Sequence, residues 1–304
     1  MATIRGRELS DTARGAVSML AGVFLFTVME AMVKWLVVDY PVHQIIFFRS
    51  AFALIPCAFF VWRAGGLATL RTKRPAIHLL RGLIGLAAMG CYFFAYSQMA
   101  LADAKAVLFS APLFMTILAI PLLGERVGRY RWSAVLTGFV GILIILDPGG
   151  AMPLPGVSAA IGGAVLYALA VITIRHLSVT ESVASITFYF TAIGAVASAA
   201  LIGVFGWVTP TPFDLAMLVT IGLIGGIAQY AMTRAFRLAE TAAIAPLDYT
   251  SMAWAIGLGY LIWGDVPSLG VCAGIVLVVA SGLFILYRER RLAGVRDSKL
   301  PRLR

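Results

Sequence analysis

Long apolar segments alternate with short polar connections along almost the whole chain. Each segment is about 17–25 residues long, the length at which a helix crosses about 30 Å of hydrocarbon. The connections are short and several contain Pro or Gly, which leaves no room for a soluble domain between them. We therefore expect an all-α membrane protein with ten spans, near residues 15–38, 42–62, 77–98, 102–123, 131–147, 157–177, 183–206, 213–235, 241–263 and 268–287.

Two of these segments repeat one pattern. Residues 101–125 and 238–265 both open with Leu-Ala and an acid, and both close on Gly and an acid, the second copy being three residues longer. The repeat divides the predicted spans into two groups of five. Because five is odd, the second group enters the membrane from the opposite side. The sequence thus predicts two inverted five-helix repeats, with a substrate site between them near the membrane centre.

Composition and charge agree with this membrane prediction. The chain is 61% hydrophobic and 12% charged, whereas soluble domains carry about 25% charged residues. The net charge of +10 comes from Lys and Arg in alternate connections, while the connections at 39–41, 147–156, 207–212 and 264–267 have none. This bias predicts that both termini are cytoplasmic. No basic stripe interleaved with aromatic residues lies outside the apolar segments, so nucleic acid is not an expected partner.

These assignments divide the chain into five parts. They are a cytoplasmic N-terminus (1–14), the first repeat (15–148), a periplasmic linker (149–156), the second repeat (157–288) and a basic cytoplasmic tail (289–304). The three cysteines lie inside apolar segments without ligand spacing, so neither a metal nor a cofactor is expected. The sequence also lacks a phosphate-binding glycine motif and a recognisable nucleophile–base or HExxH arrangement, which disfavours a membrane-embedded enzyme.

The pattern resembles the drug/metabolite transporter superfamily, in its ten-span branch with two EamA-type repeats. The resemblance is carried by Pro112 in the middle of the fourth span, by Leu-Gly-Glu at 123–125 and by the weaker copy at 241–263. It implies a secondary active transporter of the inner membrane that moves a small organic metabolite. Direction, coupling ion and oligomeric state do not follow, although protons are a candidate ion. A lipid-linked substrate flippase is the alternative that related superfamily members suggest.

Residues 246–250, Pro-Leu-Asp-Tyr-Thr, resemble members that move larger metabolites such as S-adenosylmethionine or riboflavin. Smaller solutes such as amino acids are also consistent with the family. The working hypothesis is alternating access, in which the two halves rock around a site near the membrane centre.

Ionisable residues inside the predicted spans are the first candidates for this site, because each costs at least about 2.5–3.5 kcal/mol to insert. Glu30 and Lys34 are four residues apart and share a helix face. Arg49 is predicted at similar depth. We expect the three to converge in the outer half, where their net charge suits a carboxylate or phosphate, with Glu30 as a candidate proton carrier. The alternative is a permanent Glu30–Lys34 ion pair, with Arg49 bound to backbone carbonyls.

Asp248 and Tyr249 are the strongest polar candidates of the inner half, as a second gate or proton site. The alternative for Asp248 is a hydrogen bond to a Tyr or Ser of a neighbouring helix. Trp254 is a candidate for stacking on a flat substrate, with packing as the alternative. Other polar-tipped candidates, which interhelical hydrogen bonds would also explain, are Tyr92, Tyr96, Gln98, Gln229 and Tyr230.

Three further polar residues are expected at span ends. His78 lies near Arg74 and Arg81 and is expected to be hydrated at the cytoplasmic side. Glu125 and Asp265 are expected simply to end their spans, with an ion pair to a neighbouring arginine as the alternative.

Overall fold

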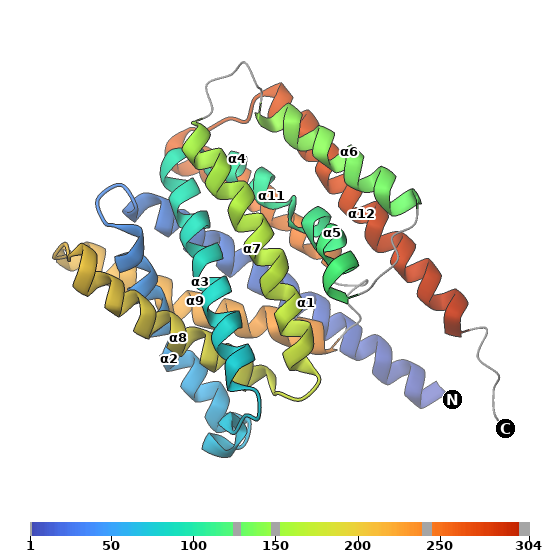
Figure 1. Ribbon diagram of the computed structural model, residues 1–304, viewed down its shortest axis with the longest axis horizontal. Helices are drawn as coiled ribbons and strands as arrows, with labels where there is room; N and C mark the ends of the chain where they lie inside the picture. Colours follow the sequence, from blue (N-terminus) through green and yellow to red (C-terminus); the bar gives the residue numbers. More distant parts are fainter. Residues whose placement is uncertain (1, 124–128, 147–152, 239–244, 298–304) are drawn as a thin grey trace.

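The protein is helical over the residues that the computed structural model describes, 2–123, 129–146, 153–238 and 245–297, and no strand occurs in these ranges (Figure 1). Two short 3-10 helices are η1 (Gly66–Leu70) and η2 (Ala245–Tyr249). The α-helices are α1 (Ala2–Leu36), α2 (Val42–Arg63), α3 (Pro75–Gln98), α4 (Leu101–Leu108), α5 (Ala111–Leu123), α6 (Arg129–Leu146), α7 (Leu154–Ser178), α8 (Val183–Phe205), α9 (Pro212–Leu238), α11 (Thr250–Trp263) and α12 (Leu269–Asp297).

Within the ranges that the structure describes, seven helical segments are long and apolar enough to cross a membrane. Two shorter apolar helices, Trp132–Ile145 and Leu269–Phe284, correspond to the fifth and tenth predicted spans. The predicted span at 241–263 begins outside the described residues and continues as η2 and α11. The expectation of an all-helical protein with several membrane-spanning helices is therefore confirmed, and the number ten stays a prediction.

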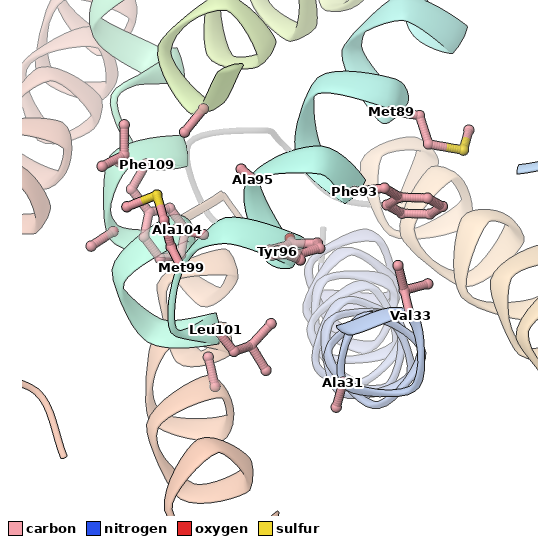
Figure 2. Close-up of a cluster of buried hydrophobic side chains, with 14 of the residues drawn as sticks. Ala31, Val33, Met89, Phe93, Ala95, Tyr96, Met99, Leu101, Ala104 and Phe109 are labelled. Atoms are coloured by element: carbon pink, nitrogen blue, oxygen red, sulfur yellow. The ribbon is translucent and has the colours of Figure 1, made fainter. Parts of the chain in front are cut away.

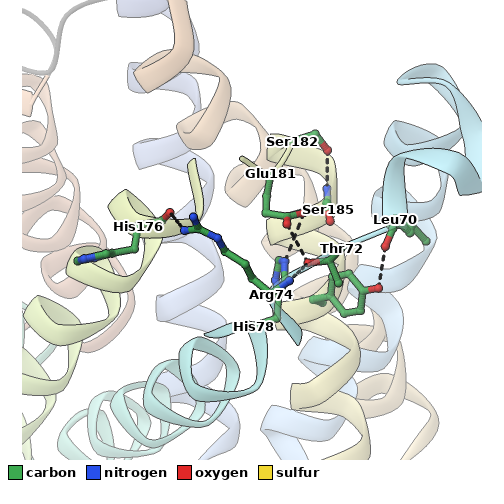
Figure 3. Close-up of polar contacts among 9 residues, drawn as sticks. Leu70, Thr72, Arg74, His78, His176, Glu181, Ser182 and Ser185 are labelled. Carbon is green, nitrogen blue, oxygen red and sulfur yellow. Dashed lines mark hydrogen bonds and ion pairs between the residues drawn. The ribbon is translucent and has the colours of Figure 1, made fainter. Parts of the chain in front are cut away.

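Proline, serine and glycine set several helix ends. Pro75 occupies the first turn of α3, where its missing N–H would have no helical partner in any case. Ser182 precedes α8, and its Oγ accepts a hydrogen bond from the backbone N–H of Ser185 at 3.0 Å (Figure 3). Gly264 ends α11 at φ +72°, a conformation that favours glycine. The local sequence therefore accounts for these boundaries.

The main packing partners connect the two halves of the chain. α1 packs mainly on α9, α3 on α7, α2 on both α8 and α9, and α6 on α12. Matching spans one to five with spans six to ten pairs α1 with α7, α2 with α8, α3 with α9 and α6 with α12. When the paired helices are exchanged, the α1–α9 contact becomes the α7–α3 contact. In the same exchange, α2–α8 and α6–α12 map onto themselves. Figure 1 shows α6 and α12 side by side at one edge of the molecule.

The α6–α12 pair packs closely because glycine lies on both sides of the contact. A Cβ built on Gly141 would lie 2.9 Å from the carbonyl oxygen of Gly274. A Cβ on Gly274 would lie 2.6 Å from the carbonyl oxygen of Gly141. Larger side chains would therefore force the two helix backbones apart.

Buried apolar side chains join α1 to the turn between α3 and α4. Figure 2 shows Phe93 and Tyr96 of α3 and Leu101 of α4 beside α1, which contributes Ala31 and Val33 to the same cluster. This packing fixes the depth at which α4 begins relative to α1. It therefore positions Lys105, one turn after Leu101 on α4, against Glu30, the residue before Ala31 on α1.

Candidate functional site

The fourth predicted span is broken, and the break has a counterpart in the second half. The chain leaves the helix at residues 109–110, between α4 and α5. When the repeats are aligned on Asp103 and Glu240, these residues correspond to 246–247, which lie in η2 ahead of α11. The two interrupted segments meet, because α4 packs against α11. Interrupted helices at corresponding positions of two repeats are typical of transporter substrate sites.

A buried ion pair lies beside the break in α4. The Lys105 Nζ pairs with the Glu30 carboxylate of α1 and donates to Thr27 Oγ1 at 3.2 Å. The two charged side chains are 9% and 17% exposed, respectively. A Glu30–Lys34 pair is wrong, because Lys105 occupies that position. Lys105 is an ionisable residue inside an apolar segment, but it lies at the start of the predicted span 102–123 and is not among the sequence-based candidates.

An acid and two tyrosines surround this pair. Asp248, in η2, lies within electrostatic reach of both Lys105 and Glu30. Tyr96 is buried and has Glu30 and Tyr92 as electrostatic neighbours. Tyr92 lies one turn away on the same face of α3 and is in turn near Glu30 and Asp248. We call Glu30, Lys105, Asp248, Tyr92 and Tyr96 the central polar cluster.

Tyr249 extends from the break in the second half toward α12. Its ring centroid lies 5.1 Å from that of Phe109, which belongs to the break in the first half. Its hydroxyl is buried against Gly282, where a Cβ would collide with it, and has no hydrogen-bond partner in the described part of the chain. Tyr249 therefore joins the two breaks by aromatic contact and lies at the α12 side of the cluster.

Arg49 has partners other than Glu30 and Lys34. It is buried where α2 meets α8, with its guanidinium over the ring of Phe190. Arg81 of α3, which was not identified as a candidate, lies over the same ring. The expected convergence of Glu30, Lys34 and Arg49 is therefore wrong, since each of the three has a different partner.

Lys34 lies near the end of α1, away from the cluster. Its Nζ is 2.9 Å from Asp265 Oδ2 and 4.6 Å from the centroid of the Trp263 ring. Asp265 follows the end of α11, as expected for a residue that ends a span, and its ion-pair partner is this lysine. Glu125, its predicted counterpart, lies outside the described residues.

Neither glutamine candidate lies in the central polar cluster. Gln98 is exposed at the end of α3 and donates to Ser97 Oγ at 3.2 Å. Gln229 Nε2 lies 3.5 Å from Thr233 Oγ1, on the next turn of its own helix. Both amides therefore make local contacts.

The two remaining aromatic candidates also lie outside the cluster. Tyr230 stacks on Phe60 of α2, with ring centroids 3.5 Å apart. Trp254 is 45% exposed and packs edge-on against Phe24 of α1 at 5.0 Å. Helix packing, the alternative given for Trp254, describes both residues as the structure places them.

A second polar cluster closes the end of the bundle where α3 begins and α7 ends (Figure 3). His78 Nε2 lies 3.7 Å from Glu181 Oε2, and Thr72 Oγ1 donates to the other oxygen of Glu181 at 2.8 Å. The expectation that His78 is hydrated is wrong, because its side chain is 2% exposed. The ring of Tyr189 packs over it, with the ring centroids 4.5 Å apart.

At the opposite end, Gln44 in the first turn of α2 bonds the connection between α8 and α9, and Tyr40, two residues before α2, bonds the first turn of α9. The Gln44 amide donates to the Val208 carbonyl at 2.7 Å and accepts from the Val208 N–H at 2.9 Å. The Tyr40 hydroxyl donates to Asp214 Oδ2 at 2.8 Å. Burial, together with this hydrogen bond, raises the pKa of Tyr40. The phenol therefore remains a hydrogen-bond donor at neutral pH.

Comparison with known proteins identifies the same two halves. The profile of the EamA-like transporter family matches residues 13–147 and again residues 154–287. A solved crystal structure aligns with a TM-score of 0.67 and 20% identity, over 92% of this chain and 99% of its own. That likeness supports the fold.

The named relatives carry different solutes. The S-adenosylmethionine uptake transporter of Rickettsia bellii (strain RML369-C) is 31% identical over 245 residues, 81% of this chain and 82% of the relative. The pseudopaline exporter CntI of Pseudomonas aeruginosa (strain UCBPP-PA14) is 32% identical over 260 residues, 84% and 90% of the two chains. The riboflavin transporter of Rhizobium johnstonii is 30% identical over 291 residues, 93% and 94% of the two chains.

Proposed function

The chain belongs to the EamA-like transporter family of the drug/metabolite transporter superfamily, and from this premise we propose that it is a secondary transporter that moves a small organic metabolite by alternating access. The observation that carries the proposal is the pair of helix breaks at corresponding positions of the two repeats. They meet beside a largely buried ion pair and a third ionisable residue, the half-buried Asp248. Buried charges of this kind are costly in a membrane and mark solute or ion pathways.

We propose that the helices form two inverted repeats of five spans each, in the inner membrane, with both termini cytoplasmic. The matched packing partners support an inverted repeat, because exchange of the two halves preserves the main contacts. The distribution of Lys and Arg supports the orientation. In Figure 1 the first turn of α1 and the last turn of α12 lie toward the same side of the molecule, as this orientation requires.

The polar contacts at the two ends are suited to act as gates. With this orientation, Lys34–Asp265 and Tyr40–Asp214 lie at the outer end, and His78–Glu181 lies at the cytoplasmic end. Each contact joins residues of the first half to residues of the second. A rocking motion of the halves would open one set while the other stays closed.

Glu30 and Asp248 are the proposed coupling residues, with protons as the coupling ion. Lys105 bonds Glu30 in the structure, and protonation of the carboxylate would remove the charge that holds the lysine. A break in this ion pair would free α1 from α4 at the centre of the bundle. The tyrosines of α3 would then contact the solute.

The test is solute counterflow in liposomes that contain the purified protein. We would use labelled S-adenosylmethionine, riboflavin, amino acids and purines, with and without an inward proton gradient. Saturable exchange of one solute is expected in the wild type, with at least a tenfold loss in Glu30→Gln. Asp11→Asn, a carboxylate near the start of the same helix, is the matched control and should transport normally. Full activity of folded Glu30→Gln would refute the proposed role of the cluster, and no exchange of any solute by folded wild type would count against the carrier.

A further inference from the structure

Two arginines that have no acidic partner in the part of the chain that the structure describes lie against one aromatic ring inside the bundle. Arg49 and Arg81 lie 5.4 and 4.4 Å from the centroid of the Phe190 ring and are only 4% and 7% exposed. Arg49 Nε and Arg81 Nε and Nη1 are buried and have no hydrogen-bond partner within the described ranges. Among the described residues, no carboxylate oxygen lies within 4.0 Å of either guanidinium.

Two cations buried next to each other require a compensating negative charge. Arginine keeps its proton in proteins, so neither residue can escape the cost by becoming neutral. The Phe190 ring attracts both cations, but it offers no acceptor for their N–H groups. A buried charge is tolerated when it is both paired and hydrogen-bonded. The contacts inside the described protein supply neither for this pair.

We propose that Arg49 and Arg81 bind an anionic group of the transported solute, a carboxylate or a phosphate. This inference rests on the proposed function and adds the charge class of the substrate. The planar fork of a guanidinium donates two parallel hydrogen bonds to either kind of group. Two such forks from different helices, α2 and α3, hold one anion between the helix pairs that the rocking motion separates.

The arginines are linked to the central polar cluster through α3 and α7. Arg81 and Tyr92 are 11 residues apart on α3, about three turns, so they share a face and lie about 16 Å apart along the axis. Tyr167 of α7 is an electrostatic neighbour of Arg81, and its ring centroid is 6.3 Å from that of Tyr92. A solute of metabolite size reaches from the arginines to the tyrosines along this face.

Glycine makes room for the guanidinium of Arg81. A Cβ on Gly85 would collide with Arg81 Nη1 and lie 2.8 Å from the Phe190 ring. Gly85→Ala therefore displaces the Arg81 guanidinium while keeping its charge. This variant tests the geometry of the pair separately from its charge.

The first experiment measures transport selectivity. Unlabelled competitors are added to the counterflow assay of the solute that the wild type exchanges, in two pairs that differ in one anionic group. One pair is S-adenosylmethionine and its decarboxylated analogue, and the other is riboflavin 5′-phosphate and riboflavin. In one of the pairs, we expect the anionic member to compete at least tenfold better than its partner in the wild type. A preference in the first pair indicates a carboxylate site, and a preference in the second indicates a phosphate site. Arg81→Gln and Gly85→Ala should lose the preference by weakening only the anionic member, with Arg81→Lys intermediate. Arg63→Gln, an exposed arginine at the end of α2, is the matched control.

Each outcome decides the proposal. A wild type that does not prefer either anionic member, or variants that weaken both members of a pair equally, overturn it; the wild-type comparison stands even where a variant fails to fold.

If no solute is exchanged, the carrier function fails by itself. The anion site is then tested by thermal unfolding of the detergent-purified protein in sodium phosphate, acetate or chloride. Stabilisation by phosphate or acetate that Arg81→Gln or Arg81→Lys reduces supports the site, and equal melting temperatures in all three salts overturn it.

Discussion

The Glu30–Lys105 ion pair allows a quantitative test of the structure. Glu30→Gln leaves Lys105 charged and unpaired in the bundle, at 9% exposure. Removal of one partner of a buried pair costs about 3–5 kcal/mol. Because Glu30 is 17% exposed, the expected cost is at the lower end, about 3 kcal/mol. For 304 residues, an unfolding entropy of about 2.1 cal/mol/K per residue converts this into a melting temperature about 5 °C lower.

The assay is a double-mutant cycle on detergent-purified protein, with unfolding followed by tryptophan fluorescence. Glu30→Gln, Lys105→Met and the double variant are compared with the wild type. The double variant should recover most of the stability, because it leaves no unpaired charge. A coupling energy of at least about 1 kcal/mol is expected for residues in direct contact.

The Lys34–Asp265 pair is the internal control for this cycle. It is also an ion pair of α1, but its aspartate is 32% exposed. Asp265→Asn should therefore cost about 1 kcal/mol or less. The buried pair would be refuted if the single variants of Glu30 and Lys105 had the melting temperature of the wild type. It would also be refuted if the double variant lost as much stability as the two single variants together.

Three further changes test other parts of the structure. Gly274→Leu should prevent recovery of monodisperse protein in size-exclusion chromatography, because even a Cβ there would lie 2.6 Å from the Gly141 carbonyl; Gly270→Leu, on the exposed face of α12, should elute normally. Trp254→Phe should leave the rate of solute counterflow within about twofold of the wild type, since a side chain that is 45% exposed packs only on its edge. Gln44→Ala should lower the free energy of unfolding by about 2 kcal/mol in thermal unfolding, through loss of two hydrogen bonds to the α8–α9 connection.

The all-helical membrane fold and its division into two repeats were predictable because they depend on local and repetitive signals, while ten spans and their inversion stay predictions. Apolar length identifies the spans, and one repeated pattern divides the chain into the two halves that the family profile also matches. The site was only partly predictable. Glu30 and Asp248 were identified because any ionisable residue inside an apolar segment is unusual. Their surroundings depend on which helices pack together, and the pattern along one helix does not specify this.

Three residues are missing from the sequence-based prediction or have other surroundings than predicted, because a pattern along one helix does not specify which helices pack together. Glu30 pairs with Lys105, 75 residues away, and not with the lysine one turn further on. Arg81 lies less than two turns after the start of α3, so the sequence pattern groups it with the basic end of its span. His78, beside it, is covered by Glu181 from a connection about 100 residues later in the chain. Such contacts need the tertiary arrangement.

The exchange of packing partners between the halves has a consequence for biosynthesis. α1 and α3 find their main partners in α9 and α7, while their contacts with each other and with α2 are few. During synthesis the first helices therefore enter the bilayer before their partners exist, and each must hold its place by its own apolar length. Lys105 and Glu30 can pair as soon as α4 is made, whereas Arg49 and Arg81 wait for Phe190 of α8. Assembly of the bundle is completed only when the second half has been translated, so the two halves form one folding unit.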